Sequence, residues 1–150
     1  DTGAPDLHNL GNDYLECSSD PFNSHEPVDS SAAIIGAQGL LRLGRYLGLE
    51  SNDGKRYFQA GLTVTRRLLS EPFLSTSDTH QGLILHSIYH QPNNWDHIPT
   101  GSKISHGEAS MWGDYHAREL ALYVGKIANG SDYRFFDCVP QPRTPHPDDR

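Results

Sequence analysis

The chain has 150 residues, of which 35% are hydrophobic, with a mean hydropathy of -0.61 and a formal net charge of -7. This length suits one domain with one core, and the composition is polar without reaching the profile of a fully disordered chain. Residues 1–30 hold seven acidic residues and no Lys or Arg, which leaves twelve acids against twelve bases in residues 31–150. Because a basic excess is missing, the sequence argues against a nucleic-acid partner.

The first segment, residues 1–29, is predicted to form an acidic, proline-rich loop or arm, since no helical or strand period persists there. Asp29 and the two serines after it are good N-cap residues, and apolar side chains follow at the spacing of one helical face. This pattern predicts a helix over 31–47 that ends at Gly48. Its small residues predict close packing against another helix, because glycine destabilises an isolated helix by about 1 kcal/mol relative to alanine. They are Ala32, Gly36, Gly39 and Gly44.

Two more helices are predicted. One runs over 53–70, with an apolar stripe opposite Arg66 and Arg67, and Pro72 stops it. The short connection to the first helix favours an antiparallel hairpin. The other begins near Glu108 or Ala109 and runs to residue 127, with Trp112, Tyr115, Leu120, Val124 and Ile127 directed inward. The chain thus divides into an arm (1–29), an all-α part (30–128) and an irregular, proline-rich tail (129–150), with no stretch of the roughly 20 apolar residues that cross a membrane.

The long connection over 73–107 holds the strongest compositional signal. Six of the nine histidines and both tryptophans fall between residues 80 and 116, near a single base, Lys103. Aromatic faces cover apolar sugar surfaces, while imidazole and ammonium groups bind hydroxyls and carboxylates, so the segment suits a sugar or organic-acid site. The alternative is that these residues pack and cap a helical bundle.

Metal and nucleophile chemistry find less support in the sequence. His86 and His90 lie four residues apart, and His106 with Glu108 forms an H-x-E fragment, but neither has the partners of a known zinc motif. A small histidine-based metalloenzyme remains a third alternative, which the finding of bound zinc would support. Cys17 and Cys138 lie in the irregular terminal segments and allow at most one disulfide. No G-x-S-x-G, P-loop or dinucleotide-binding motif occurs in the sequence.

Three blocks carry a resemblance to a known family. They read EPVDSSAA (26–33), LILHSIYH (83–90), and GE (107–108) followed by MWGDY (111–115). Over residues 26 to about 127 the chain resembles the C-terminal part of the unsaturated glucuronyl hydrolases of glycoside hydrolase family 88, with unsaturated rhamnogalacturonyl hydrolases as more distant relatives. The resemblance implies an (α/α)6 barrel of twelve helices, of which this chain supplies about three.

The resemblance also implies a reaction. These enzymes remove the 4,5-unsaturated uronic acid that polysaccharide lyases leave on an oligosaccharide, by hydrating its enol ether double bond. Two aspartates do this acid and base work, without a metal or organic cofactor, and a cytoplasmic or periplasmic location is implied. The motifs that hold these aspartates have no match in residues 1–28, so no catalytic residue is assigned in this chain. Asp114, at the start of a predicted helix, is expected to have a structural role.

By position in the family, His86 corresponds to a histidine that lines the site beside the departing sugar. Ser102 and Lys103 resemble a Ser/Lys element that contacts anionic groups on that sugar, and Tyr89 and His90 are included because they are adjacent. The implied partners are an acidic oligosaccharide and the remaining barrel helices or a second copy, since end helices would expose apolar flanks. The alternative is a non-catalytic helical domain that binds a saccharide or a protein.

Overall fold

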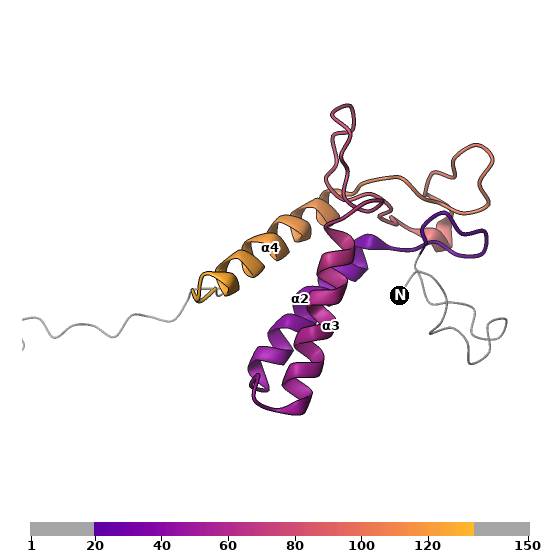
Figure 1. Ribbon diagram of the computed structural model, residues 1–150. Coiled ribbons are helices and arrows are strands. Elements are labelled where there is room, and N and C mark those ends of the chain that lie inside the picture. Colours follow the sequence, from indigo (N-terminus) through magenta and orange to yellow (C-terminus); the bar gives the residue numbers. More distant parts are fainter. Residues whose placement is uncertain (1–19, 134–150) are drawn as a thin grey trace, which may run out of the picture.

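A computed structural model describes residues 20–133 and is all-α over that range (Figure 1). Its α-helices are α2 (Ser30–Tyr46), α3 (Asn52–Leu68) and α4 (Met111–Ala128), and the short 3-10 helix η2 spans Gln91–Asn93. Each predicted helix is found within three residues of its expected bounds. Both cysteines, most of the predicted arm and most of the predicted tail lie outside the described residues. Within residues 20–133 no helix is long and apolar enough to cross a bilayer.

The helices begin where side chains can cap them. The Asp29 carboxylate accepts a hydrogen bond from the Ser31 N–H at the start of α2, and the Ser51 hydroxyl accepts one from the Gly54 N–H at the start of α3. The third helix starts later than the Glu108 or Ala109 that the sequence predicts. Ser110 is its cap, and the Ser110 hydroxyl accepts a 3.0 Å hydrogen bond from the Gly113 N–H.

Helices α2 and α3 form the expected antiparallel hairpin, and two glycines allow their backbones to approach closely. A Cβ atom added at Gly44 would lie 2.6 Å from the Phe58 backbone nitrogen, and one at Gly61 would lie 2.8 Å from Leu41 Cγ. The prediction of close packing was wrong for Ala32, Gly36 and Gly39, which are all exposed; nothing lies within 4 Å of a Cβ added at either glycine. They lie on the face of α2 opposite the core.

Helix α4 packs across α2, and polar contacts fix the crossing. The Gln38 side-chain amide donates to the backbone oxygen of His116 at 2.8 Å. The Arg42 guanidinium lies 3.7 Å from the Glu119 carboxylate and stacks over the Tyr123 ring. Tyr115 was predicted to point inward but is half exposed. The core is formed by Ile34, Ala37, Leu41, Leu68, Phe73, Ile84, Ala117, Leu120 and Tyr123.

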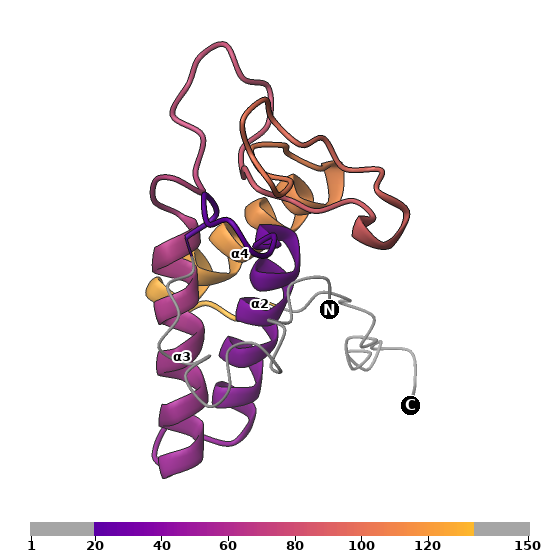
Figure 2. The ribbon, with the colours of Figure 1, turned by 90° about the vertical axis from the view of Figure 1, so that its right-hand side faces the viewer.

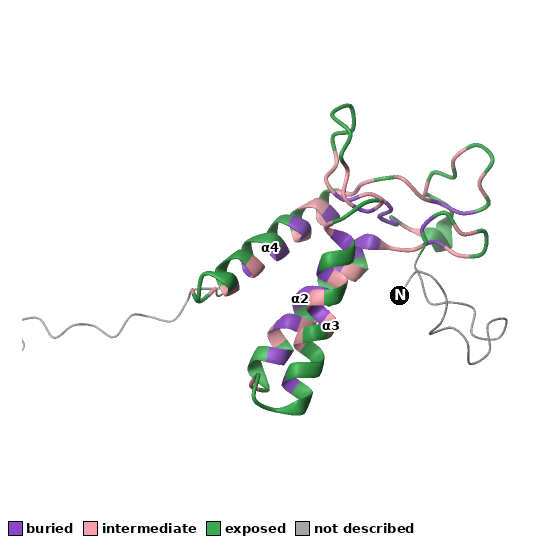
Figure 3. Cartoon of the chain, viewed as in Figure 1, coloured by how far each residue is buried: buried purple, intermediate pink, exposed green. Residues whose placement is uncertain are grey.

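Each helix buries only part of its surface (Figure 3). On α2 the large apolar side chains of Ile35, Leu43 and Tyr46 are exposed, by 46%, 39% and 87%. The long connection between α3 and α4, in contrast, buries several side chains although it contains no α-helix or strand among the described residues. Its buried members include Phe73, Ile84, His86, Ile88 and Ile104.

Candidate functional site

The connection from α3 to α4, residues 69–110, forms a loop layer at one end of the helices (Figures 1 and 2). At this end α2 and α4 begin and α3 ends. An isolated antiparallel bridge joins Leu74 and Ile84, and around it the Ser75 N–H donates to Leu83 O at 2.8 Å. The chain therefore turns back on itself after α3, and residues 83 and 84 of the LILHSIYH block pair with the segment that follows that helix.

Two carboxylates from the helix ends hold the returning segment. One Asp114 oxygen accepts both the Leu83 N–H, at 2.9 Å, and the Ile84 N–H, at 3.0 Å. The Asp29 carboxylate that caps α2 also accepts the Ile88 N–H at 3.2 Å. Asp114 thus binds loop backbone, which is a structural role of the kind expected from the sequence.

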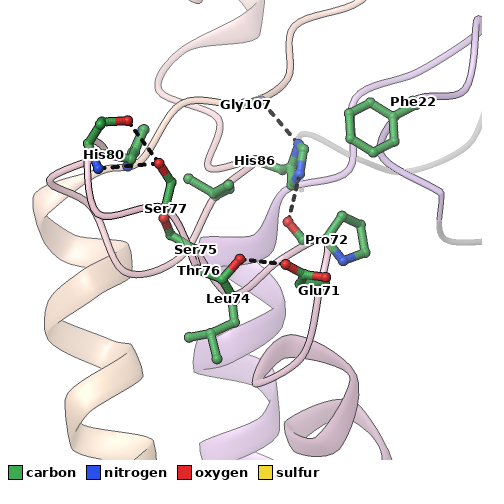
Figure 4. A pocket seen from close by; sticks show the side chains of 12 residues that line it. Phe22, Glu71, Pro72, Leu74, Ser75, Thr76, Ser77, His80, His86 and Gly107 are labelled. Atoms are coloured by element: carbon green, nitrogen blue, oxygen red, sulfur yellow. Dashed lines mark hydrogen bonds between the residues drawn. The ribbon is translucent and has the colours of Figure 1, made fainter.

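His86 lies at the centre of the loop layer and is 2% exposed. Its Nε2 lies 3.1 Å from the backbone oxygen of Pro72, and its Nδ1 accepts the Gly107 N–H at 3.0 Å (Figure 4). The ring must therefore be neutral, with its proton on Nε2, because only Nε2–H can donate to a carbonyl while Nδ1 accepts. Burial lowers the pKa of His86 and favours this neutral form. The backbone φ of +68° is rare for a residue with a side chain.

The first cavity, called here the histidine cavity, has a volume of about 510 Å³ and is lined by Phe22, His86, Gly107 and the chain that follows α3 (Figure 4). Both nitrogens of His86 bind backbone, so the polar groups left for a ligand are largely hydroxyls. The Ser75 Oγ atom is buried and has no hydrogen-bond partner among the described residues. The other hydroxyl residues of the lining are Thr76, Ser77 and Thr79.

The second cavity, called here the aromatic cavity, measures about 560 Å³ and contains both tryptophans of the chain. Tyr89 stacks on Trp95 with ring centroids 5.7 Å apart, and its centroid lies 5.5 Å from that of Trp112. The sequence placed Trp95 and Trp112 in the aromatic cluster but did not assign them to the site. The full lining is Ser87, Tyr89, Trp95, Asp96, His97, Glu108, Ala109, Ser110, Met111 and Trp112.

A third cavity of about 230 Å³ contains Lys103, with His25 and the amides of Gln91 and Asn94. Asp96 lines both this lysine cavity and the aromatic cavity. The Asp96 carboxylate is fixed between them, because it accepts the backbone N–H groups of Tyr89 and of His90, the latter at 2.9 Å.

The predicted site residues are therefore neighbours that face different cavities. His86 lines the first cavity, Tyr89 the second and Lys103 the third. The Ser102 hydroxyl is bound to His106 Nε2 at 2.7 Å, and the ring of His90 packs against Trp95 at 5.0 Å.

The histidine and aromatic cavities share a wall, called here the partition, made of His86–Ser87 and Gly107–Glu108. Two hydrogen bonds join its halves: the Gly107 N–H donates to His86 Nδ1 at 3.0 Å, and the Ser87 N–H donates to Glu108 O at 2.9 Å. His86 and Gly107 line one cavity, while Ser87 and Glu108 line the other. The neutral His86 ring is thus a structural member of the wall.

The described residues that line the three cavities offer binding through aromatic rings, hydroxyls, carboxylates, imidazoles and the Lys103 ammonium group. Within residues 20–133, no three His, Cys, Asp or Glu residues gather in a way that could hold a metal ion. Comparison with known proteins adds no relative: no family model, no curated protein and no solved structure matches the chain.

Proposed function

We propose that this chain forms one wall of the saccharide site of an unsaturated glucuronyl hydrolase of the family 88 type, as part of an (α/α)6 barrel. One observation carries the proposal: the three sequence blocks that resemble the family converge at the cavities. Asp29 of the first block binds the Ile88 N–H of the second, and the Trp112 indole N–H of the third donates to Ser31 Oγ of the first at 3.1 Å. The second and third blocks together form the partition.

In this proposal the chain binds the substrate, and the two catalytic aspartates lie in other parts of the barrel. Three aspartates of this end of the molecule support this division, since Asp29, Asp96 and Asp114 all accept backbone N–H groups. Their oxygens are occupied by loop backbone, whereas a general acid or base must reach the reacting atom of the substrate. The exposed apolar side chains of α2 are the surface that further barrel helices would cover.

Calorimetric titration with an unsaturated uronyl disaccharide tests the binding wall. We expect heat of binding with no consumption of the double bond, which is followed by its ultraviolet absorbance. Lys103→Ala is expected to weaken binding at least fivefold, because Lys103 is the one lysine or arginine among the described residues that line the three loop-layer cavities. Lys55→Ala, at an exposed position on α3, is the matched control. Equal affinity of the two variants would contradict the proposed site. Rapid turnover by this chain would contradict the proposal that the catalytic aspartates lie in other parts of the barrel.

A helical binding domain without hydrolase function is the second candidate. The exposed Ile35 and Leu43 of α2 favour it, because apolar side chains on one helix face also suit a protein partner. This candidate predicts no heat from the unsaturated disaccharide. The same titration therefore separates the two functions.

A further inference from the structure

The aromatic cavity has a lining that differs in kind from the rest of the loop layer. Tyr89 lies in the middle of a row of three rings, with Trp95 on one side and Trp112 on the other. Tyr89 and Trp95 are 58% and 60% exposed, so these large aromatic surfaces are open to solvent within a cavity. An aromatic surface of this kind binds the apolar face of a sugar ring.

The charges around these rings are negative. Asp96 and Glu108 line the cavity, and none of the described residues in its lining is a lysine or an arginine. Lys103 lies beyond Asp96 in the lysine cavity. A sulfate or carboxylate placed on the aromatic row would face two carboxylates without a permanent cation beside it, and like charges at such distances repel.

We propose that the aromatic cavity binds an uncharged pyranose ring and discriminates against a sulfated one. The inference rests on the proposed function, since it identifies the neutral sugar as the residue linked to the unsaturated uronic acid. Hydroxyl groups of such a ring have a partner at the rim, where the exposed Glu108 lies. A small organic cation is the less favoured ligand, because the rings stand in a row and do not enclose a box around one point.

The chain provides its own reporter for this cavity. It contains only two tryptophans, and both line the aromatic cavity. The two indole N–H signals in a proton–nitrogen NMR spectrum therefore report on binding there, while calorimetry reports on binding anywhere. The probes are an unsaturated uronyl N-acetylhexosamine disaccharide, its 6-O-sulfated counterpart, a methyl N-acetylhexosaminide without the uronic acid, and tetramethylammonium.

We expect the unsulfated disaccharide to shift both indole signals and to bind at least tenfold more tightly than the sulfated one. Trp95→Ala should weaken its binding at least fivefold, as seen at the remaining Trp112 signal, whereas Tyr46→Ala, at an exposed ring on α2, should leave it unchanged. Glu108→Gln should reduce the discrimination against sulfate about threefold or more. Glu50→Gln, at an exposed position between α2 and α3, is the control for the loss of one charge.

The outcomes separate the inference from the proposed function. Heat of binding without indole shifts would overturn the inference and leave the proposed function standing. Indole shifts with the methyl glycoside, but no binding of either disaccharide, would support the neutral sugar site and overturn the proposed function. Equal affinity for the two disaccharides, shifts caused only by tetramethylammonium, or no binding of any probe would overturn the inference.

Discussion

The helical hairpin and the loop layer are ordered by different forces. In the hairpin of α2 and α3, apolar side chains at helical spacing are buried between capped helices whose backbones meet at Gly44 and Gly61. In the loop layer, a few side chains accept backbone N–H groups from residues far away in the sequence. Asp29 reaches residue 88, Asp114 reaches residues 83 and 84, and His86 reaches residue 107.

Because of this difference, the two regions respond to different kinds of substitution. The hairpin depends on the shape and area of contact, so a change of volume at the helix contact acts on the whole structure. The loop layer depends on single acceptors, so the loss of one acceptor leaves backbone N–H groups unsatisfied and acts on the cavities first. We therefore expect a substitution at the helix contact to lower the free energy of unfolding more than one in the loop layer. The opposite order would contradict this distinction between the two regions.

Gly44→Ala is expected to have the largest effect. The added Cβ would lie 2.6 Å from Phe58 N and 2.7 Å from Gly54 O, both backbone atoms, so the helices must move apart. We expect the free energy of unfolding to fall by about 3 kcal/mol, measured by chemical denaturation. Gly39→Ala is the matched control: with nothing within 4 Å of its Cβ, it should raise stability by about 0.5–1 kcal/mol through helix propensity. Equal effects of the two would refute the close helix contact.

Asp114→Ala is expected to have the next largest effect. It removes the acceptor that the Leu83 and Ile84 N–H groups share, and the loss of one charged acceptor costs about 1.5–3 kcal/mol. We expect a loss of about 2 kcal/mol and faster amide hydrogen exchange at residues 83 and 84. Asp53→Ala is the control, because Asp53 also lies in the first turn of a helix but is exposed. If the two variants lose the same stability, Asp114 acts only through the helix dipole.

The protonation of His86 is expected to have the smallest effect. Burial holds its folded-state pKa below the ordinary value of 6.5, so between these two pKa values the unfolded chain binds more protons than the folded one. The stability that neutral His86 contributes is therefore complete above pH 6.5 and declines as the pH falls below it. Denaturation of the wild type and of His86→Gln at a series of pH values from 7.5 to 5 measures this. The difference in unfolding free energy between them should shrink as the pH falls; a constant difference would contradict the neutral, backbone-bound ring.

The sequence predicted the helices better than the site because the two depend on different information. Periodic apolar residues and the caps Asp29 and Ser51 are local signals, and they placed α2 and α3 within two residues. The start of α4 was missed by two or three residues, since Ser110 was not recognised as its cap. The exposure of Gly36 and Gly39 could not be foreseen, because composition does not say which face of α2 meets α3.

The candidate site was predicted as a neighbourhood but not as an arrangement. The clustering of histidines and tryptophans located the loop layer, and the resemblance selected His86, Tyr89 and Lys103. Spacing could not show that these three face different cavities, which depends on hydrogen bonds between residues 21 or more positions apart. The backbone partners of the two His86 nitrogens, at Pro72 and Gly107, are also distant in the sequence, so no local pattern predicts these hydrogen bonds.

The partition also sets where the chain can change in length. His86 and Ser87 are consecutive in the chain but face different cavities, and the His86 backbone has a φ of +68° at this point. One residue inserted between 84 and 87 would shift this segment against Gly107 and Glu108 and break the two hydrogen bonds that join the halves of the partition. An insertion at the exposed turn of residues 100–101 would leave both cavities intact. Related chains should therefore differ in loop length at that turn, and by substitution alone at the wall.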